Sequence, residues 1–257
     1  MGRGSSSVGA GGGGGTVAQK TVSNVPVNTT NLTDQEASNL RDQQDSMYNA
    51  NTTAAVKMYI SNTNFDNQGH SLSQTMNYLL DNGVDLNTAD LNTINRQYGL
   101  RLTASDLASM QYTNGYMAVA THPIGKSVNL QRGAHDDLLK NTFGISDYSK
   151  MSESQLQSAL VGKAFQTTSY MSTSYDITKN PFLSSSSGSG VSGGREVVYN
   201  IKAGANTKML FGAQKQSEIV LDKGTNFKIT NVKYTGKIAT PRGQGAKNQI
   251  VIDIETF

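Results

Sequence analysis

Several polar residues that could carry chemistry stand at the borders of apolar stretches. Gln216 and Glu218 lie two positions apart, where a polar run meets the apolar residues 219–221. In an extended strand, residues i and i+2 point to the same face, so this amide and this carboxylate are expected to project together. Arg132 follows an alternating apolar stretch, and Ser172 opens a Ser-Thr-Ser sequence at the end of another.

These residue types suit the cleavage of a bond between a ribose and a good leaving group. The planar guanidinium of Arg132 can bind a diphosphate through parallel hydrogen bonds. The carboxylate of Glu218 can stabilise positive charge that develops at an anomeric carbon, and the Ser172 hydroxyl can orient that carboxylate. Taken singly, each residue also has a structural explanation, such as a weak surface ion pair between Arg132 and Asp136 or Asp137.

Residues 32–122 carry the signals of a helical lobe. A Ser or Thr followed three residues later by an acidic or amide residue forms a capping box, which marks a helix start. The expected helices begin at Thr33 (running toward residue 60), at Ser71, at Asn87 or Thr88 (ending at Gly99) and at Thr103.

From residue 123 onward the apolar period changes to two, which is typical of half-buried strands. The expected strands are Ser127–Gly133, Phe165–Ser174, Glu196–Ile201, Lys208–Phe211, Glu218–Leu221, Phe227–Tyr234 and Gln249–Ile254. A capping box at Ser152 predicts one helix after a polar linker. Helices followed by short strands, without regular βαβ alternation, predict an α+β fold.

Composition predicts one folded domain with an N-terminal tail. Residues 1–31 contain an unbroken glycine run at 11–15 and are expected to be a disordered tail. Residues 32–257 are expected to form the domain, with a helical lobe (32–122) and a β core (123–257). The chain has no cysteine, which excludes disulfides and thiolate sites. There is no apolar run of membrane-spanning length and no recognisable signal peptide, so secretion, delivery into a target cell and phage association all stay open.

The charge distribution suits a phosphate-bearing ligand. Residues 1–110 carry 6 Lys/Arg against 9 Asp/Glu, whereas residues 111–257 carry 16 against 10. This mildly basic half falls short of the concentrated basic stripe that nucleic-acid binding requires. The three histidines are scattered without an H-x-x-x-H spacing, so no metal site is expected.

The polar residues also form an ordered set. Arg132, then Ser172-Thr173-Ser174, then Gln216-x-Glu218, each on an expected strand, resemble the Arg–Ser–Glu class of mono-ADP-ribosyltransferases. The likeness is to the clostridial Rho-modifying exoenzymes and related toxin and phage-encoded domains, and it covers about residues 33–257. It extends to the Gly-Thr-x-Phe-x-Ile sequence at Gly224–Ile229. The resemblance implies a helical lobe and a mostly antiparallel, two-sheet β core with a central NAD cleft.

The resemblance also implies an activity. The protein would cleave the nicotinamide–ribose bond of its co-substrate NAD, without a metal, and transfer ADP-ribose to a protein acceptor. Glu218 would act at the ribose, Arg132 with Gly133 would bind NAD, and Ser172 would orient Glu218. Gln216 would address the acceptor, and a glutamine at this position implies an asparagine, glutamine or other non-arginine acceptor.

Further residues receive roles from the same resemblance. The remaining cofactor-site residues would be Thr173, Ser174, Phe182 and Arg195, and the substrate-recognition turn would be formed by Phe211, Gly212, Ala213, Gln214, Lys215 and Gln216. Two alternatives stay open. One is a phage head-associated structural or interaction protein that uses the fold without turnover. The other is an NAD glycohydrolase that has no protein acceptor.

Overall fold

Helices come first along the chain and strands follow, as the sequence predicts for an α+β fold. The computed structural model describes residues 28–61, 63–134, 137–176, 196–212, 217–239 and 246–257. Its helices are α1 (Asp34–Ser46), α2 (Ala50–Ile60), α3 (Leu72–Asp81), α4 (Leu91–Tyr98), α5 (Ala104–Ala120), α6 (Asp137–Phe143) and α7 (Glu153–Leu160). Its strands are β1 (His122–Pro123), β2 (Val128–Ala134), β3 (Ala164–Gln166), β4 (Met171–Ser174), β5 (Val197–Ala203), β6 (Lys208–Phe211), β7 (Glu218–Leu221), β8 (Asn226–Ala239) and β9 (Ala246–Thr256). Within these ranges no helix has both the length and the apolar character needed to span a membrane.

Capping residues set the helix starts, and most of the predicted ones are confirmed. The side chains of Thr33, Ser71, Thr103 and Ser152 each accept a hydrogen bond from the backbone three residues later, within a complete capping box. Gly99 ends α4 in the left-handed conformation, with φ at 66°, which a glycine adopts without steric cost. Local sequence therefore determines where these helices begin and end.

Two helix boundaries differ from the prediction. The helix expected to run from the first capping box to about residue 60 is two helices, because Asn49 caps a new start and accepts a hydrogen bond from the backbone of α2. The third expected helix begins after Asp90 and not at Asn87 or Thr88. Asp90 is the N-cap because its carboxylate accepts a hydrogen bond from the first turn of α4. The backbone N–H of Asn87 donates instead to Asp85.

The β region also contains helices and strands that are not predicted from the sequence pattern. The stretch Phe165–Ser174 is two strands and not one, since residues 164–166 pair with β8 and residues 171–174 pair with β7. The expected polar linker after residue 134 contains α6 and a 3₁₀ turn, because Leu139 and Tyr148 are buried against the sheet. Strand β1, only two residues long, pairs with β6 and was not predicted.

Among the described residues, nine strands form one hydrogen-bonded sheet in the order β1-β6-β7-β4-β2-β5-β9-β8-β3. Neighbouring strands are antiparallel except β5 and β9, which are parallel. The two expected sheets correspond to the two halves of this sheet, because a single residue pair, Gln131 with Ser174, joins β2 to β4. On β2 the paired residue directly precedes Arg132, and on β4 it lies two residues after Ser172.

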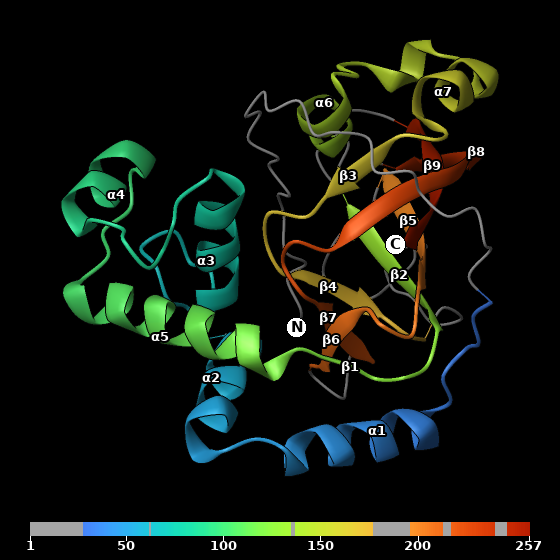
Figure 1. The fold of residues 1–257 in the computed structure, drawn as a ribbon. Coiled ribbons are helices and arrows are strands. Elements are labelled where there is room, and N and C mark those ends of the chain that lie inside the picture. The colour runs from blue at the N-terminus through green and yellow to red at the C-terminus, as the bar shows by residue number, and fades with distance from the viewer. Residues whose placement is uncertain (1–27, 62, 135–136, 177–195, 213–216, 240–245) are drawn as a thin grey trace.

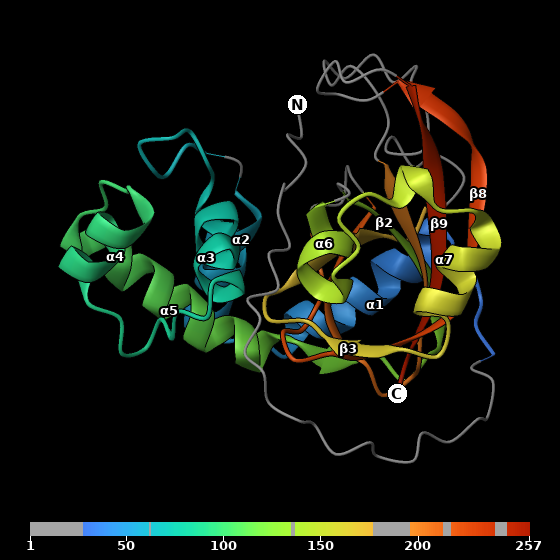
Figure 2. The same cartoon turned by 90° about the horizontal axis from the view of Figure 1, so that it is seen from above.

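Two hydrophobic clusters lie on opposite faces of β6 and β7. Leu210 and Val220 belong to the cluster built with α2–α5, whereas Met209 and Ile219 belong to the cluster of the sheet itself. This alternation follows from the two-residue period of a strand. Figure 1 shows α2–α5 beside this half of the sheet, and the turned view in Figure 2 shows the same arrangement. Strands β6 and β7 are therefore covered on both faces.

Helix α1 packs with the sheet and not with the rest of the predicted helical lobe. Leu32 and Ala37 belong to the cluster of the sheet, and the Gln44 side chain forms hydrogen bonds with β6. Of the predicted tail, residues 1–27 lie outside the described residues, and Thr30 forms a parallel bridge with Val128 of β2.

Candidate active site

Arg132 and Ser172 meet where the two halves of the sheet join. The guanidinium Nη1 of Arg132 on β2 donates a hydrogen bond of 2.8 Å to the backbone carbonyl of Ser172 on β4. Arg132 is only 7% exposed, and its Nε has no hydrogen-bond partner among the described residues. A buried guanidinium that keeps a donor free is suited to bind an anionic group with directional hydrogen bonds.

The surroundings of Arg132 are desolvated and carry negative charge. Burial lowers the pKa of Arg132 below its ordinary value, and the charges of Asp81 and Glu218 oppose that shift. Arginine still keeps its charge at neutral pH, because its ordinary pKa is so high. An anionic ligand at this guanidinium would offset part of the cost of burying the cation.

Glu218 begins β7 directly opposite Ser174 of β4. Because Ser172 lies two residues before Ser174, Ser172 and Glu218 point to the same face, as diagonal neighbours whose Cα atoms are about 7–8 Å apart. Val220 lies on that face as well and packs against α2–α5. The carboxylate and the hydroxyl therefore face the helices.

The backbone around Glu218 has two unusual features. Gly212 donates a backbone hydrogen bond of 2.9 Å to the Glu218 carbonyl, and a Cβ at Gly212 would lie 2.2 Å from Glu218 Oε2. The carboxylate thus rests on backbone that only glycine leaves open. Ser217 has a φ of 50°, which is costly for a residue with a side chain. Such strain next to a carboxylate is typical of functional sites, where the surrounding structure enforces it.

Two residues of the helices complete this site, and the sequence analysis missed both. Burial raises the pKa of Tyr59 on α2, whose side chain lies within the electrostatic reach of Glu218 and Arg132 and near Ser172. Asn77 on α3 donates hydrogen bonds of 3.0 Å to the Tyr59 hydroxyl and 3.1 Å to the carbonyl of Tyr170. A signal for this face exists in the sequence, since Asn77 and Asp81 are polar residues four positions apart in the otherwise apolar second half of α3.

The other predicted residues on β2 and β4 hold strands together. The Thr173 hydroxyl donates a hydrogen bond of 2.7 Å to the Ile219 carbonyl and so ties β4 to β7. Ser174 pairs with Gln131 at the junction, and Gly133 follows Arg132 within the paired part of β2. These contacts position the strands that carry Arg132, Ser172 and Glu218.

The predicted recognition turn is described only at its start. Phe211 is the last residue of β6 and is buried in the cluster of the sheet, so it belongs to the strand, and Gly212 follows it. The remaining predicted residues, Phe182, Arg195, Ala213, Gln214, Lys215 and Gln216, lie outside the described residues.

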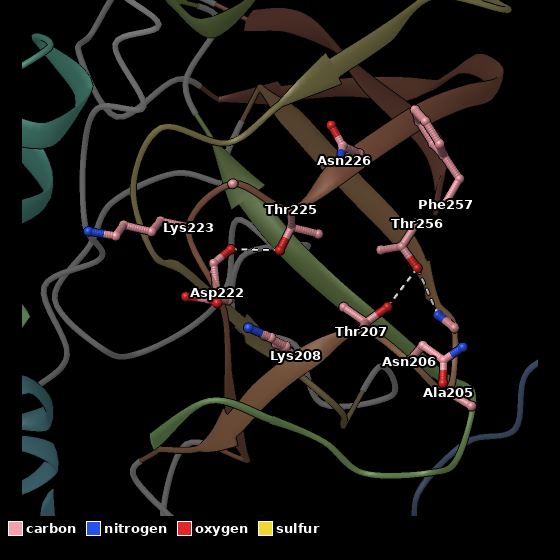
Figure 3. Close-up of a pocket in the computed structure, with 12 residues that line it drawn as sticks. Ala205, Asn206, Thr207, Lys208, Asp222, Lys223, Thr225, Asn226, Thr256 and Phe257 are labelled. Carbon is pink, nitrogen blue, oxygen red and sulfur yellow. Dashed lines mark hydrogen bonds between the residues drawn. The ribbon is translucent and has the colours of Figure 1, made fainter. Parts of the chain in front are cut away.

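A separate polar hollow lies at the other end of β6 and β7. Its volume is about 470 Å³, and Figure 3 shows Lys208 and Asp222 beside Thr207 and Thr225 in its wall. Asp222 follows the last residue of β7, whereas Glu218 is the first, so this hollow is distinct from the candidate site. In the part of the chain that the structure describes, no group of three His, Asp or Glu side chains could hold a metal ion.

Solved structures with the same fold include exoenzymes and an ADP-ribosyltransferase toxin. The Clostridium limosum C3 exoenzyme has 16% sequence identity and a TM-score of 0.55, over 90% of this chain and 98% of that chain. C3stau2 from S. aureus, solved with NAD, has 17% identity and a TM-score of 0.53, over 89% and 98%. Plx2a, an ADP-ribosyltransferase toxin from Paenibacillus larvae, has 13% identity and a TM-score of 0.55, over 87% and 96%. Identities this low show a shared fold.

The sequence itself places the chain in a family. The ADP-ribosyltransferase exoenzyme family matches residues 60–257, which include Arg132, Ser172 and Glu218. No curated protein has a significantly similar sequence. The resemblance seen in the sequence is thereby confirmed, and so is the α+β fold of this class. The chain belongs to the ADP-ribosyltransferase exoenzyme family and is an NAD-dependent mono-ADP-ribosyltransferase.

Proposed function

We propose that this enzyme transfers ADP-ribose from NAD to a non-arginine side chain of a protein acceptor, with Glu218 as its catalytic carboxylate. The observation that carries the proposal is the convergence of three residues from three strands. Arg132 donates a hydrogen bond to the backbone carbonyl of Ser172, and both Arg132 and Tyr59 lie within the electrostatic reach of Glu218. These residues are far apart in sequence, and a purely structural role gives no reason to gather them at one junction.

Each residue then has a chemical role. Arg132 binds the diphosphate of NAD, because its guanidinium is held by Ser172 through Nη1 and keeps Nε as a donor without a partner among the described residues. Glu218 accepts a hydrogen bond from the ribose and stabilises the oxocarbenium-like charge as the C1′–N bond breaks. Nicotinamide leaves with the bonding electron pair as a neutral molecule. The acceptor nitrogen then attacks C1′ and loses its proton.

The class of acceptor follows from Gln216. This residue lies two positions before Glu218, outside the described residues, so its role rests on the Gln-x-Glu sequence alone. In the Arg–Ser–Glu class, a glutamine at this position goes with asparagine or other non-arginine acceptors. We therefore expect an amide side chain to be modified.

Nicotinamide release tests the catalytic assignment. Wild-type protein incubated with NAD labelled in the nicotinamide ring should release label, and Glu218→Gln should slow release by at least about a hundredfold, as loss of a group that stabilises the transition state does. Glu255→Gln, which removes the same charge from β9, should keep the wild-type rate. Equal rates in all three proteins would contradict a catalytic role of Glu218, and no release at all would favour a structural role of the fold.

A second label in the ADP-ribose part tests the acceptor. Incubation with a cell lysate should place this label on a protein, and mass spectrometry should locate it on Asn or Gln. Gln216→Ala should keep release of nicotinamide but lose most of the protein labelling. Label that appears only as free ADP-ribose would identify a glycohydrolase, and label on arginine would contradict the assigned acceptor class.

A further inference from the structure

We propose that Gln44 on α1 is a positioning residue for Glu218, acting through the end of β6. The inference rests on the proposed function, in which Glu218 is the catalytic carboxylate. The two hydrogen bonds of the Gln44 amide go to the backbone of β6. They fix the backbone of residues 209–211, which leads into Gly212, on which the Glu218 side chain rests.

The contact between α1 and β6 imitates a neighbouring strand. Gln44 is 3% exposed, its Nε2 donates a hydrogen bond of 2.8 Å to the Met209 carbonyl, and its Oε1 accepts one of 3.0 Å from the Phe211 N–H. Strand β1 pairs with Lys208 and Met209, so its pairing along β6 stops before Leu210. The primary amide of Gln44 therefore continues the hydrogen bonding of β6 for one more residue.

This anchored segment leads directly to the carboxylate. Successive residues of a strand direct their backbone groups to opposite edges, so the N–H of Phe211 points to α1 while that of Gly212 points to β7. There the Gly212 N–H donates a hydrogen bond of 2.9 Å to the Glu218 backbone carbonyl. The Gly212 Cα faces the Glu218 side chain, so a Cβ added to Gly212 would lie 2.2 Å from Oε2. A shift at Phe211 consequently moves the surface that holds Glu218.

A second residue of α1 contacts the same strand end. Arg41, three residues before Gln44, places its guanidinium carbon 5.9 Å from the centre of the Phe211 ring. Gln44 and Arg41 thus secure the backbone and the side chain of Phe211 from one helix face. A helix that only covered the sheet would need neither a buried amide nor this match of donor and acceptor.

The chemistry of the amide provides a selective test. Gln44 donates and accepts at the same time, which a carboxylate cannot do, because it has no proton to give to Met209. Once protonated, the carboxyl group introduced by Gln44→Glu can donate to Met209 and accept from Phe211. Burial favours this neutral form, so protonation is expected at a pH above that of an exposed glutamate. Charged groups around the site are Arg41 and Asp45 on α1 and Glu218 beyond Gly212.

The experiment compares nicotinamide release as a function of pH in four proteins. At about pH 8, Gln44→Glu should have a kcat about ten- to a hundredfold below wild type, because a small displacement of a catalytic group costs that much. The deficit should shrink as the pH falls toward about 5, since the carboxyl group becomes protonated. Gln44→Met should show the deficit at every pH. Gln43→Glu, which adds the same charge on the exposed face of α1, should follow wild type.

Two further measurements separate positioning from general damage. Activities are divided by the folded fraction at each pH, and NAD affinity is measured by calorimetry. Positioning predicts that kcat falls while NAD affinity stays near wild type, because Arg132 is untouched. Hydrogen exchange at the Phe211 amide should be faster in Gln44→Met. A wild-type kcat per folded molecule in Gln44→Met, or a deficit in Gln44→Glu that does not change with pH, would overturn the proposal. An inactive wild type would contradict the proposed function instead, and Phe211 exchange would then still report whether the anchor exists.

Discussion

At the scale of single residues, Glu218 depends on a neighbour that has no side chain. The carboxylate lies over Gly212, where an added Cβ would be 2.2 Å from Oε2 and 2.6 Å from the carboxyl carbon. Such distances are far below van der Waals contact, so either the carboxylate or the end of β6 would have to move. The strained Ser217 and the anchored Phe211 leave little freedom for that movement.

Gly212→Ala should therefore inactivate the enzyme without unfolding it. Displacement of Glu218 by an ångström or more is expected to lower kcat by about a hundredfold. Nicotinamide release measures the loss, and circular dichroism checks the fold. Gly115→Ala is the matched control, because Gly115 is an exposed position of α5 where an added Cβ meets no atom within 4 Å. It should keep full activity and raise the free energy of unfolding by about 1 kcal/mol, the helix preference of alanine over glycine. Wild-type activity in Gly212→Ala would show that Glu218 tolerates another position.

At the scale of elements, α1 connects the start of the fold to the site. Its first turn is tied to the loop before β2 by an ion pair of 2.5 Å between Glu36 and Lys126, and its last turn is tied to β6 through Gln44. The hydrogen bond from Lys126 is the main cause that lowers the pKa of Glu36 to about 2. The ionised form of this exposed carboxylate is thus favoured in the folded protein.

Glu36→Gln should lower stability in a pH-dependent way. Glutamine keeps the capping box with Thr33, so the substitution removes the ion pair and leaves the helix start. A lowered pKa gives stability that is fully present above the ordinary value of 4.5 and is lost as the pH falls through about 2. The melting temperature of Glu36→Gln should be below wild type at neutral pH and equal to it near pH 2. High salt should reduce the difference, because the pair is exposed.

Asp42→Asn serves as the control for that experiment. It removes a negative charge from the exposed face of the same helix, and no capping contact is lost. Its melting curve should follow wild type at each pH. A deficit in Glu36→Gln that persists unchanged down to pH 2 would attribute the effect to the helix and not to the ion pair.

The elements that the sequence predicts well are those fixed by local rules. Four capping boxes and the Gly99 C-cap appear where expected, because each needs only residues within one turn. The strands β6 and β7 are predicted to the residue, since both alternate between two cores. Residues 165–174 are predicted as one strand because local sequence does not show which strands they pair with. Their pairing with β8 and with β7 divides them into β3 and β4.

The site divides in the same way. Arg132, Ser172 and Glu218 are proposed from their order and strand context; the structure brings them to one junction, and their roles stay predictions. Tyr59, Asn77 and Gln44 could not be proposed in that way, because their importance depends on which helix packs on which strand. Gln44 is one of several glutamines in a polar helix, and only the register of α1 against β6 distinguishes it from Gln43.

At the scale of the whole molecule, strands β6 and β7 are shared between two cores. Leu210 and Val220, together with Tyr170, complete the cluster of α2–α5, and the alternate residues complete the cluster of the sheet. The candidate site lies on the face turned to the helices, with Tyr59 and Asn77 supplied from that side. We infer that the helices and the sheet form one cooperative unit, as the prediction of a single domain requires.

Two neighbouring residues of β6 test this cooperativity. Met209 and Leu210 are both fully buried, but the first faces the core of the sheet and the second faces the helices. Either Met209→Ala or Leu210→Ala creates a cavity that should cost about 2–5 kcal/mol. If the molecule unfolds as one unit, both variants shift the same single transition in calorimetry and in urea, detected by far-ultraviolet and tyrosine signals alike.

The opposite result would be equally clear, because the two substitutions differ only in the core they affect. If α2–α5 fold independently of the sheet, two unfolding transitions should appear. Leu210→Ala should then lower the midpoint temperature of the helix transition alone, and Met209→Ala that of the sheet transition alone. Glu218 lies on β7, which both cores cover, so Leu210→Ala should then lose nicotinamide release at the temperature of the lower transition. A single transition in both variants would instead mean that the site is lost only when the whole fold is lost.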